Sequence, residues 1–233
     1  MKRFYKTVGV VPAGGGFGVT LDGKPIKSPA KADFVVPSRA LAEAVAAEWD
    51  AQADKVVPSA MPLMQLAATA IDKTAPNRQV VIDGIAPYGG SDLLCYRAEA
   101  PMELVERQAA AWQPLLDWAM TAHDAPLAVT SGIVHQAQPE PSLAALRAAV
   151  AAQDDWRLTA LHQATALTGS LVLGLALLAG RIDADEAFEL AELDASFQIE
   201  RWGEDAEATA RRAGLRAELQ AAARLVTLAA HPI

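Results

Sequence analysis

The sequence predicts an α+β protein, with a small β-rich N-terminal domain followed by a larger, mostly α-helical C-terminal domain. Two observations support this fold class. Short β-branched and aromatic runs separated by turn residues are concentrated in the first forty residues. Beyond Pro58 the chain is rich in Ala, Leu, Glu and Gln at helical spacing, with interruptions at proline, glycine or short polar runs. We therefore place the domain boundary near residue 58, which gives domains 1–58 and 59–233.

Turn residues separate the strands expected in the N-terminal domain. Asp22 and Gly23 predict a tight hairpin, because glycine tolerates the positive φ that a primed turn requires. The glycine-rich stretch from Gly14 to Gly18 lacks the Lys-Ser/Thr ending of a phosphate-binding loop, and no helix follows it, so we interpret it as a β-turn or bulge. The expected strands are residues 4–11, 17–21, 24–27 and 34–36.

A helix follows the strands, and Ser38 is its expected N-cap. Apolar residues then repeat at helical spacing until about residue 55, at Leu41, Val45 and Trp49. The helices expected in the C-terminal domain are 63–73, 77–85, 91–96, 102–122, 142–152, 156–167, 170–179, 184–201 and 206–229.

Two of these helices carry particularly clear signals. In the helix that begins at residue 102, apolar residues recur at steps of three and four, so this face is expected to be buried. Asp183 and Glu186 have the spacing of a capping box at the start of the helix 184–201. The buried stripe of that helix is expected to contain Ala187, Leu190, Leu193 and Phe197.

Composition and charge exclude several classes of protein. With 52% hydrophobic residues, the 233-residue chain can bury a sizeable core. A formal net charge of −8 disfavours binding to nucleic acid, whose phosphates would be repelled. The longest apolar stretch, residues 167–179, is shorter than the roughly 18 to 20 residues that span a bilayer, so we expect a buried core helix there.

The residues that usually bind metals or form disulfides are sparse. Cys95 is the only cysteine, which excludes an intrachain disulfide and a zinc site of several thiolates, and fits a reducing compartment. The four histidines are scattered without metal-ligand spacing. The N-terminal residues have no apolar run behind their basic residues, so neither a secretory signal nor a transit peptide is expected. We predict no metal, cofactor or catalytic residue.

A serine after two glycines, Ser91, offers an alternative function. It could be a nucleophile, but no Gly-x-Ser-x-Gly elbow is present, and N-capping of the helix 91–96 is the favoured interpretation. The alternative to a binding protein is therefore an enzyme or small-molecule-binding protein with a cleft at the domain junction. Its site would contain Ser91, Asp92, Tyr96 and Arg97.

The most informative segment surrounds Gly203, which ends one helix before another begins. Glu204, Asp205 and Glu207 occupy the first turn of the second helix, where carboxylates complement the helix dipole. These residues are either only caps or, together with Trp202, a surface that contacts a basic patch on a partner. The residues alone favour the capping interpretation, because acidic first turns are common.

Several segments along most of the chain resemble one family. These segments are 3–6, 21–29, 47–52, 61–63, 70–72, 91–97 and 167–170, together with Trp202-Gly203-Glu204-Asp205-Ala206-Glu207-Ala208 and the preceding Leu193-Asp194 and Phe197-Gln198. They are similar to the chaperones that attend the α subunit during assembly of the F(1) sector of ATP synthase.

The resemblance implies a two-domain, non-enzymatic chaperone. Members of that family bind the unassembled α subunit and shield it from aggregation until it pairs with the β subunit. On this basis Trp202, Glu204, Asp205 and Glu207 are the expected partner-binding residues. Mitochondrial members carry a targeting extension that this sequence does not show, so a bacterial, cytoplasmic protein is expected.

Overall fold

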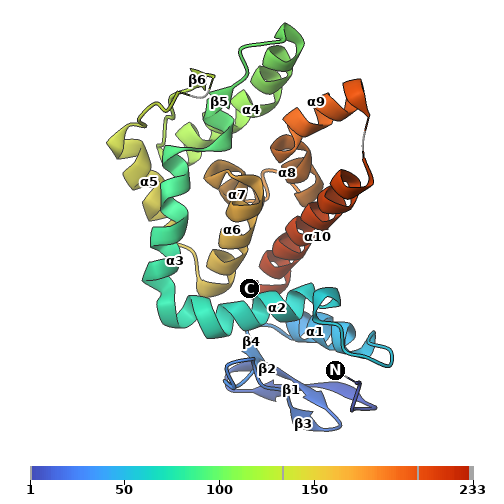
Figure 1. Ribbon diagram of the computed structural model, residues 1–233. Coiled ribbons are helices and arrows are strands. Elements are labelled where there is room, and N and C mark those ends of the chain that lie inside the picture. Colours follow the sequence, from blue (N-terminus) through green and yellow to red (C-terminus); the bar gives the residue numbers. More distant parts are fainter. Residues whose placement is uncertain (1, 133, 204, 231–233) are drawn as a thin grey trace. The chain divides into compact units, whose positions relative to one another are not determined.

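The computed structural model describes residues 2–132, 134–203 and 205–230 and confirms the α+β class (Figure 1). The chain forms two compact units. The first unit comprises Met1–Arg78, Asp155–Ala160 and Ala221–Ile233, and the second comprises Gln79–Asp154 and Leu161–Gln220. These units do not coincide with a division at residue 58, and the two-domain boundary at that position stays a prediction.

The first unit contains an antiparallel sheet with β2 at its centre. The strands are β1 (Val8–Ala13), β2 (Gly16–Leu21), β3 (Lys24–Pro25) and β4 (Val35–Val36). β1 pairs with the whole of β2, whereas β3 and β4 pair with opposite ends of it. Asp22 and Gly23 have φ angles of 49° and 77°, which confirms the predicted hairpin. The predicted turn at the glycine-rich stretch is the β1–β2 hairpin connection.

Helix α1 (Arg39–Asp50) packs against β1 and β2. The Ser38 Oγ accepts a hydrogen bond from the Leu41 N–H at 3.0 Å, so the predicted N-cap is confirmed. Leu41 and Val45 are buried, and Trp49 is half-buried. The helix ends at Asp50, about five residues before the end that the apolar spacing predicts.

Helix α2 (Pro62–Thr69) begins where a carboxylate from α1 meets its free backbone amides. The two carboxylate oxygens of Glu48 accept hydrogen bonds from the N–H groups of Leu63 and Met64, each at 2.8 Å. Burial raises the pKa of Glu48, although these hydrogen bonds oppose the shift. A π turn (Ala70–Thr74) and a 3-10 turn (Ala75–Asn77) continue the chain.

The helices that follow account for most of the chain. They are α3 (Arg78–Ile85), α4 (Met102–His123), α5 (Glu140–Ala151), α6 (Asp155–Thr168), α7 (Leu171–Leu178), α8 (Ala184–Ala191), α9 (Leu193–Trp202) and α10 (Ala206–Ala229). Within the second unit, α4 contacts α5, α7 and α9, and α8 contacts α7 and α9. The expected apolar face of α4 is largely buried, at Leu104, Gln108 and Leu115.

Helix α7 forms part of the core of the second unit. Every residue from Leu171 to Leu178 is buried, which confirms the prediction of a buried core helix. Ser170 caps this helix, because its Oγ accepts a hydrogen bond from the Leu173 N–H at 3.0 Å. Among the described residues, no helix combines the length and apolar character needed to cross a membrane.

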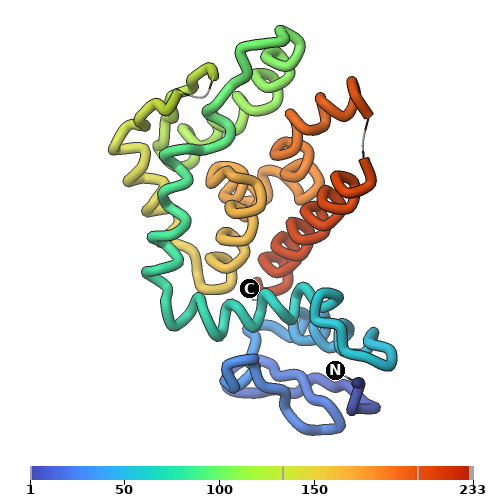
Figure 2. Tube along the Cα trace, viewed as in Figure 1, coloured from blue at the N-terminus to red at the C-terminus, as the bar shows by residue number. Residues whose placement is uncertain are grey.

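One predicted helix, 184–201, is divided into α8 and α9. Glu192, which lies between them in the sequence, has a φ of −100° and a ψ of 19°. The chain changes direction between α8 and α9 (Figure 2). The capping box is confirmed, because Asp183 and Glu186 exchange backbone-to-carboxylate hydrogen bonds of 2.8 Å. The predicted buried stripe is correct at Ala187 and Phe197, whereas Leu190 and Leu193 are only half-buried. The break interrupts the helical register on which that stripe was predicted.

A second departure concerns the segment 91–96, for which a helix is expected. It forms a 3-10 turn (Leu93–Cys95) followed by strand β5 (Tyr96–Arg97), which pairs in parallel with β6 (Thr130–Ser131). Strands of two residues are too short to produce a periodic pattern in the sequence. The composition around them is typical of helices, so the helix predicted for 91–96 is wrong. Further 3-10 turns lie at Pro58–Ala60 and Ala86–Gly90.

Candidate partner-binding site

The burial of Phe197 fixes the orientation of α9, the helix that leads into the predicted site. Its side chain is 3% exposed, as the apolar spacing predicts. The guanidinium groups of Arg107 and Arg201 lie 5.2 Å and 4.3 Å from its ring centre, in cation–π contact. Arg201 also forms an ion pair of 2.6 Å with Glu103 on α4. One face of α9 is therefore held against its own unit, while another is left for solvent.

Trp202, at the end of α9, is 77% exposed. Sequence reasoning left open whether this indole supports the helix junction from beneath or faces a partner, and the structure places it outside the core. The next residue, Gly203, has a φ of +85°, which a residue with a β-carbon rarely adopts, and its N–H donates to the Ile199 carbonyl at 2.8 Å. The chain therefore leaves α9 sharply, immediately after its exposed indole.

Asp205 and Glu207 lie at the start of α10. The Asp205 Oδ1 accepts a hydrogen bond from the Ala208 N–H at 2.8 Å, so Asp205 is an N-cap. Glu207 is exposed in the first turn. Glu204, the remaining residue of the predicted set, lies outside the described residues. The capping interpretation therefore holds for Asp205, where it involves only the Oδ1 atom. It does not account for Glu207.

Trp202 and Asp205 line a pocket of about 260 Å³ between α9 and α10, and Glu207 does not. Sequence reasoning missed Ala208, Arg211 and Arg212, which line the pocket from α10. It also missed the α9 residues of the pocket wall, Ala195, Gln198 and Ile199. A signal for them was present, because these three residues and Trp202 recur at steps of three, one and three, which places them on one helical face. We refer to this pocket together with Trp202, Asp205 and Glu207 as the junction surface.

The charges around the junction surface are mostly paired. Glu192 accepts hydrogen bonds from both Arg211 and Arg212, at 2.9 Å and 2.7 Å, and Arg107 pairs with Glu200 at 2.7 Å. By contrast, within the described parts of the chain no cation forms an ion pair with Asp205 or Glu207. Glu192 carries a single negative charge for two guanidinium groups, and Arg211 and Arg212 also line the pocket that contains Asp205. Two carboxylates without an ion-pair partner among the described residues and two arginines therefore lie beside an exposed indole.

Two residues of the alternative site, Asp92 and Arg97, form structural contacts. Asp92 is fully buried, and its carboxylate accepts hydrogen bonds from the Leu94 N–H, the Val172 N–H and the Ser170 hydroxyl, at 3.1, 3.0 and 2.7 Å. Burial raises the pKa of Asp92, and these hydrogen bonds oppose the shift. Ser91 is exposed, and Asp92 rather than Ser91 caps the short turn. The expectation that Ser91 is an N-cap is therefore wrong.

The other two members of that set are held by local contacts. Arg97 is buried, and its guanidinium donates to the carbonyl oxygens of Leu94 and Gln108 at 2.9 Å each. The Tyr96 hydroxyl lies 2.9 Å from Nδ1 of His135. Cys95 is buried too, and burial raises the pKa of its thiol to about 12, so it is a thiol rather than a reactive thiolate at neutral pH. Asp92 and Arg97 thus hold the local backbone in place.

An exposed indole beside carboxylates that form no ion pair is typical of surfaces that contact other proteins. Comparison with known proteins places the chain in the class of molecular chaperones. The model of the ATP12 chaperone protein family matches residues 2–120, and the chain belongs to this family. It is a chaperone for the assembly of F(1)-ATPase.

Individual relatives agree with this assignment. Protein atp12, mitochondrial, from Schizosaccharomyces pombe is 26% identical over 214 residues, which cover 87% of this chain and 74% of the relative. The crystal structure of Atp12 from Paracoccus denitrificans is 45% identical with a TM-score of 0.93, and 98% of each chain is covered. A putative chaperone from Agrobacterium tumefaciens, Atu1473, is 44% identical with the same TM-score, covering 97% of this chain and 85% of that one.

Proposed function

We propose that this chaperone binds the unassembled α subunit of F(1)-ATPase through the junction surface, and releases it when the β subunit pairs with α. The observation that carries the proposal is the exposure of Trp202 beside Asp205 and Glu207, which form no ion pair with any described cation. Glu204 stays a predicted member of this surface. In this proposal the chain makes and breaks no covalent bond and uses no cofactor.

The physical reason for such a chaperone lies in the exposed surface of its client. A subunit that will later be buried in an oligomer exposes apolar area before assembly, and this area promotes aggregation. A chaperone that covers part of it lowers the concentration of free aggregating surface. Displacement by the β subunit is favourable if the final interface is larger than the one with the chaperone.

A charge reversal tests whether the junction surface binds the client. Glu207→Lys should reduce capture of purified α subunit, measured by co-purification and by light scattering of α at raised temperature. The matched control is Glu140→Lys, because Glu140 is also an exposed acidic residue in the first turn of a helix, α5. Both variants lose the same helix-dipole interaction, worth about 0.3 to 1 kcal/mol.

Only the Glu207 variant should lose capture if the junction surface binds α. Trp202→Ala provides a second arm, because removal of a 77% exposed side chain should leave the fold intact and weaken binding. Equal capture by wild type, Glu207→Lys and Trp202→Ala would remove the junction surface from the proposed interface. Failure of the wild-type chain to bind α would remove the α subunit as the client.

We also propose a bacterial, cytoplasmic location. The two bacterial relatives described above are 44% and 45% identical to this chain, whereas the mitochondrial relative from Schizosaccharomyces pombe is 26% identical. Fractionation of the source cells, followed by immunoblotting for this chain, tests the location.

A further inference from the structure

Three segments that carry the family resemblance, 3–6, 21–29 and 47–52, meet at a pocket in the first unit. Its volume is about 380 Å³, near the lower end of the roughly 300 to 1,000 Å³ typical of ligand pockets. Such a volume accommodates one or two side chains more readily than a large cofactor. This pocket shares no lining residue with the junction surface, and the proposed binding of the α subunit does not involve it. The lining residues are Phe4, Tyr5, Leu21, Asp22, Lys24, Pro25, Ile26, Lys27 and Trp49.

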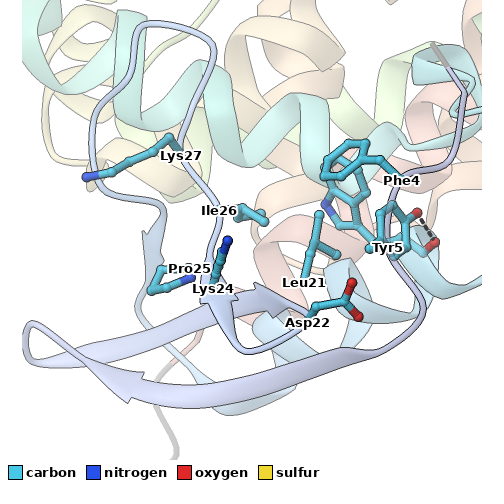
Figure 3. A pocket seen from close by; sticks show the side chains of 9 residues that line it. Phe4, Tyr5, Leu21, Asp22, Lys24, Pro25, Ile26 and Lys27 are labelled. Carbon is cyan, nitrogen blue, oxygen red and sulfur yellow. Dashed lines mark hydrogen bonds between the residues drawn. The ribbon is translucent and has the colours of Figure 1, made fainter.

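One side of the pocket is aromatic. In Figure 3 the rings of Phe4 and Tyr5 lie on one side, with Leu21 and Ile26 between them and the lysines. The Tyr5 ring contacts those of Phe4 and Trp49 edge to face, with ring centres 5.4 Å and 5.6 Å apart. Tyr5 is buried, but Phe4 is 63% exposed. An aromatic ring is therefore held at the mouth of the pocket, where a second apolar group can cover it.

The opposite side of the pocket is basic. Lys24 and Lys27 are both exposed there (Figure 3). Lys27 forms an ion pair with Asp33, whereas Lys24 forms none within the described ranges. Asp22 also lines the pocket, and its Oδ1 accepts hydrogen bonds from the Lys6 N–H, the Thr7 N–H and the Thr7 hydroxyl at 2.8 to 3.0 Å, which lower its pKa and keep the carboxylate charged. The ammonium group of Lys24 is therefore the cation of this pocket that has no ion-pair partner among the described residues.

The surrounding sequence has the same sign of charge. Residues 1–36 contain six Lys or Arg residues and two Asp residues, a net charge of +4 in a chain whose net charge is −8. Four of these basic residues lie outside the pocket, Lys2, Arg3, Lys6 and Lys31, and of these Arg3 forms an ion pair with Asp50 at 3.4 Å. A small ligand in the pocket would leave this additional charge unused, whereas a chain segment that extends beyond the pocket would be attracted by it.

We infer that this pocket is a second docking site of the chaperone, which binds an acidic segment of its protein client by one apolar side chain. The apolar side chain enters between Phe4 and Ile26, and an adjacent carboxylate approaches Lys24. The inference rests on the proposed function only in taking a polypeptide as the client, and it does not require that client to be the α subunit. The chaperone then has two docking surfaces, which hold different parts of one client.

The test measures binding of synthetic peptides to the full chain by fluorescence anisotropy. The probe is a fluorescein-labelled peptide of eight residues, with one leucine flanked by glutamates. The matched peptide has glutamine in place of each glutamate. The glutamate peptide should bind more tightly, and its affinity should fall as salt is added, because exposed charges are screened.

Two variants locate the binding. Lys24→Glu should weaken the glutamate peptide about fivefold, as expected for reversal of one exposed charge. Phe4→Ala should weaken both peptides about tenfold by loss of apolar contact. Both residues are exposed, so folding should be retained. The matched control is Lys73→Glu, which makes the same charge change at an exposed residue of the first unit that does not line the pocket, and should leave affinity nearly unchanged.

A spectroscopic readout separates this site from the junction surface. Trp49 lines the pocket and Trp202 lies at the junction surface, so fluorine NMR of the chain labelled with 5-fluorotryptophan reports on both. Trp49→Phe and Trp202→Phe assign the two signals. The glutamate peptide should shift the Trp49 signal and leave that of Trp202 in place.

Three results of the peptide-binding and labelling experiments would overturn the inference. They are equal affinity for the glutamate and glutamine peptides, unchanged affinity of Lys24→Glu, and a shift of the Trp202 signal alone. Complete displacement of the peptide by an equal concentration of phenylacetate would also overturn it, because the pocket would then be a small-molecule site. Loss of α-subunit capture in Glu207→Lys with normal peptide binding would leave the inference intact, so the two proposals fail separately.

Discussion

Two acidic regions of the second unit differ in how the fold uses their carboxylates. Asp92 is buried and accepts three hydrogen bonds that join the turn at Leu93–Cys95 to the start of α7. Asp205 and Glu207 lie on the surface, where one carboxylate oxygen caps α10 and no described cation pairs with either residue. A buried carboxylate whose oxygens accept hydrogen bonds from its own fold is not accessible to a partner protein. The exposed pair keeps both its charge and its accessibility.

The largest expected effect is at the buried region. Asp92→Ala leaves three buried donors without an acceptor, at about 1 to 3 kcal/mol each. We expect the free energy of unfolding to fall by roughly 5 kcal/mol, measured by urea denaturation followed by circular dichroism. Glu207→Ala in the same assay should change it by no more than about 1 kcal/mol, the helix-dipole contribution of an exposed carboxylate in a first turn. A loss below 1 kcal/mol for Asp92→Ala would contradict the structural role assigned here.

The two aromatic residues of α9 provide the next comparison. Phe197→Ala removes a ring that is 3% exposed and should cost about 3 to 5 kcal/mol, because a buried aromatic is replaced by a cavity. Trp202→Ala, five residues later, should cost less than about 0.5 kcal/mol. The melting temperature of each variant measures the difference. An unchanged melting temperature of Phe197→Ala would be inconsistent with its burial.

Alkaline pH should destabilise the region around Asp92 through its neighbour Cys95. Burial, aided by the charge of Asp92, raises the pKa of this thiol to about 12 in the folded chain, against an ordinary value of 9.0. The folded state therefore keeps a proton that the unfolded state loses above pH 9. The contribution to stability is fully present below that value and is lost as pH rises towards 12.

Between pH 8 and pH 10 this thiol should reduce the free energy of unfolding by about 1.4 kcal/mol. Cys95→Ala lowers stability by an amount independent of pH and abolishes this additional loss. Urea denaturation of both chains at the two pH values isolates the effect, because all other titrating groups are common to them. Equal losses in the two chains would show that the thiol does not carry the shift.

The smallest effect separates capping from contact at the junction surface. Asp205→Ala removes the N-cap of α10 and should cost about 1 kcal/mol, whereas Asp205→Asn keeps a good cap and should cost only a few tenths. Thermal denaturation measures this order. If Asp205 also contacts the client by its charge, Asp205→Asn should weaken capture of α despite its near-normal stability. Full capture by Asp205→Asn would restrict this residue to capping.

Much of the fold could be predicted because its signals are local. The hairpin at Asp22 and Gly23, the N-cap Ser38 and the capping box of α8 each depend on residues within a few positions of one another. The bounds of α10 agree with its predicted range for the same reason. The exceptions are short elements, β5 and β6, and the break between α8 and α9, where the pattern continues although the helix does not.

The candidate site could be predicted less completely. The family resemblance identifies the segment that contains the site. The helix-dipole rule explains why carboxylates occur in the first turn of α10. The wall of the pocket on α9 was missed, although its helical spacing was present in the sequence. No local signal indicates that Glu192 forms ion pairs with Arg211 and Arg212, because these residues are 19 and 20 positions away from it.

The amino-acid sequence by itself determined the order and type of most elements, because helix and strand periods, caps and tight turns arise from neighbouring residues. Tertiary structure alone decided the environment of individual side chains. It buried Asp92 against Ser170 and Val172, left Trp202 in solvent, and brought Phe4, Lys24 and Trp49 to one pocket. Burial and charge pairing depend on residues tens of positions apart, and only the folded chain brings these residues together.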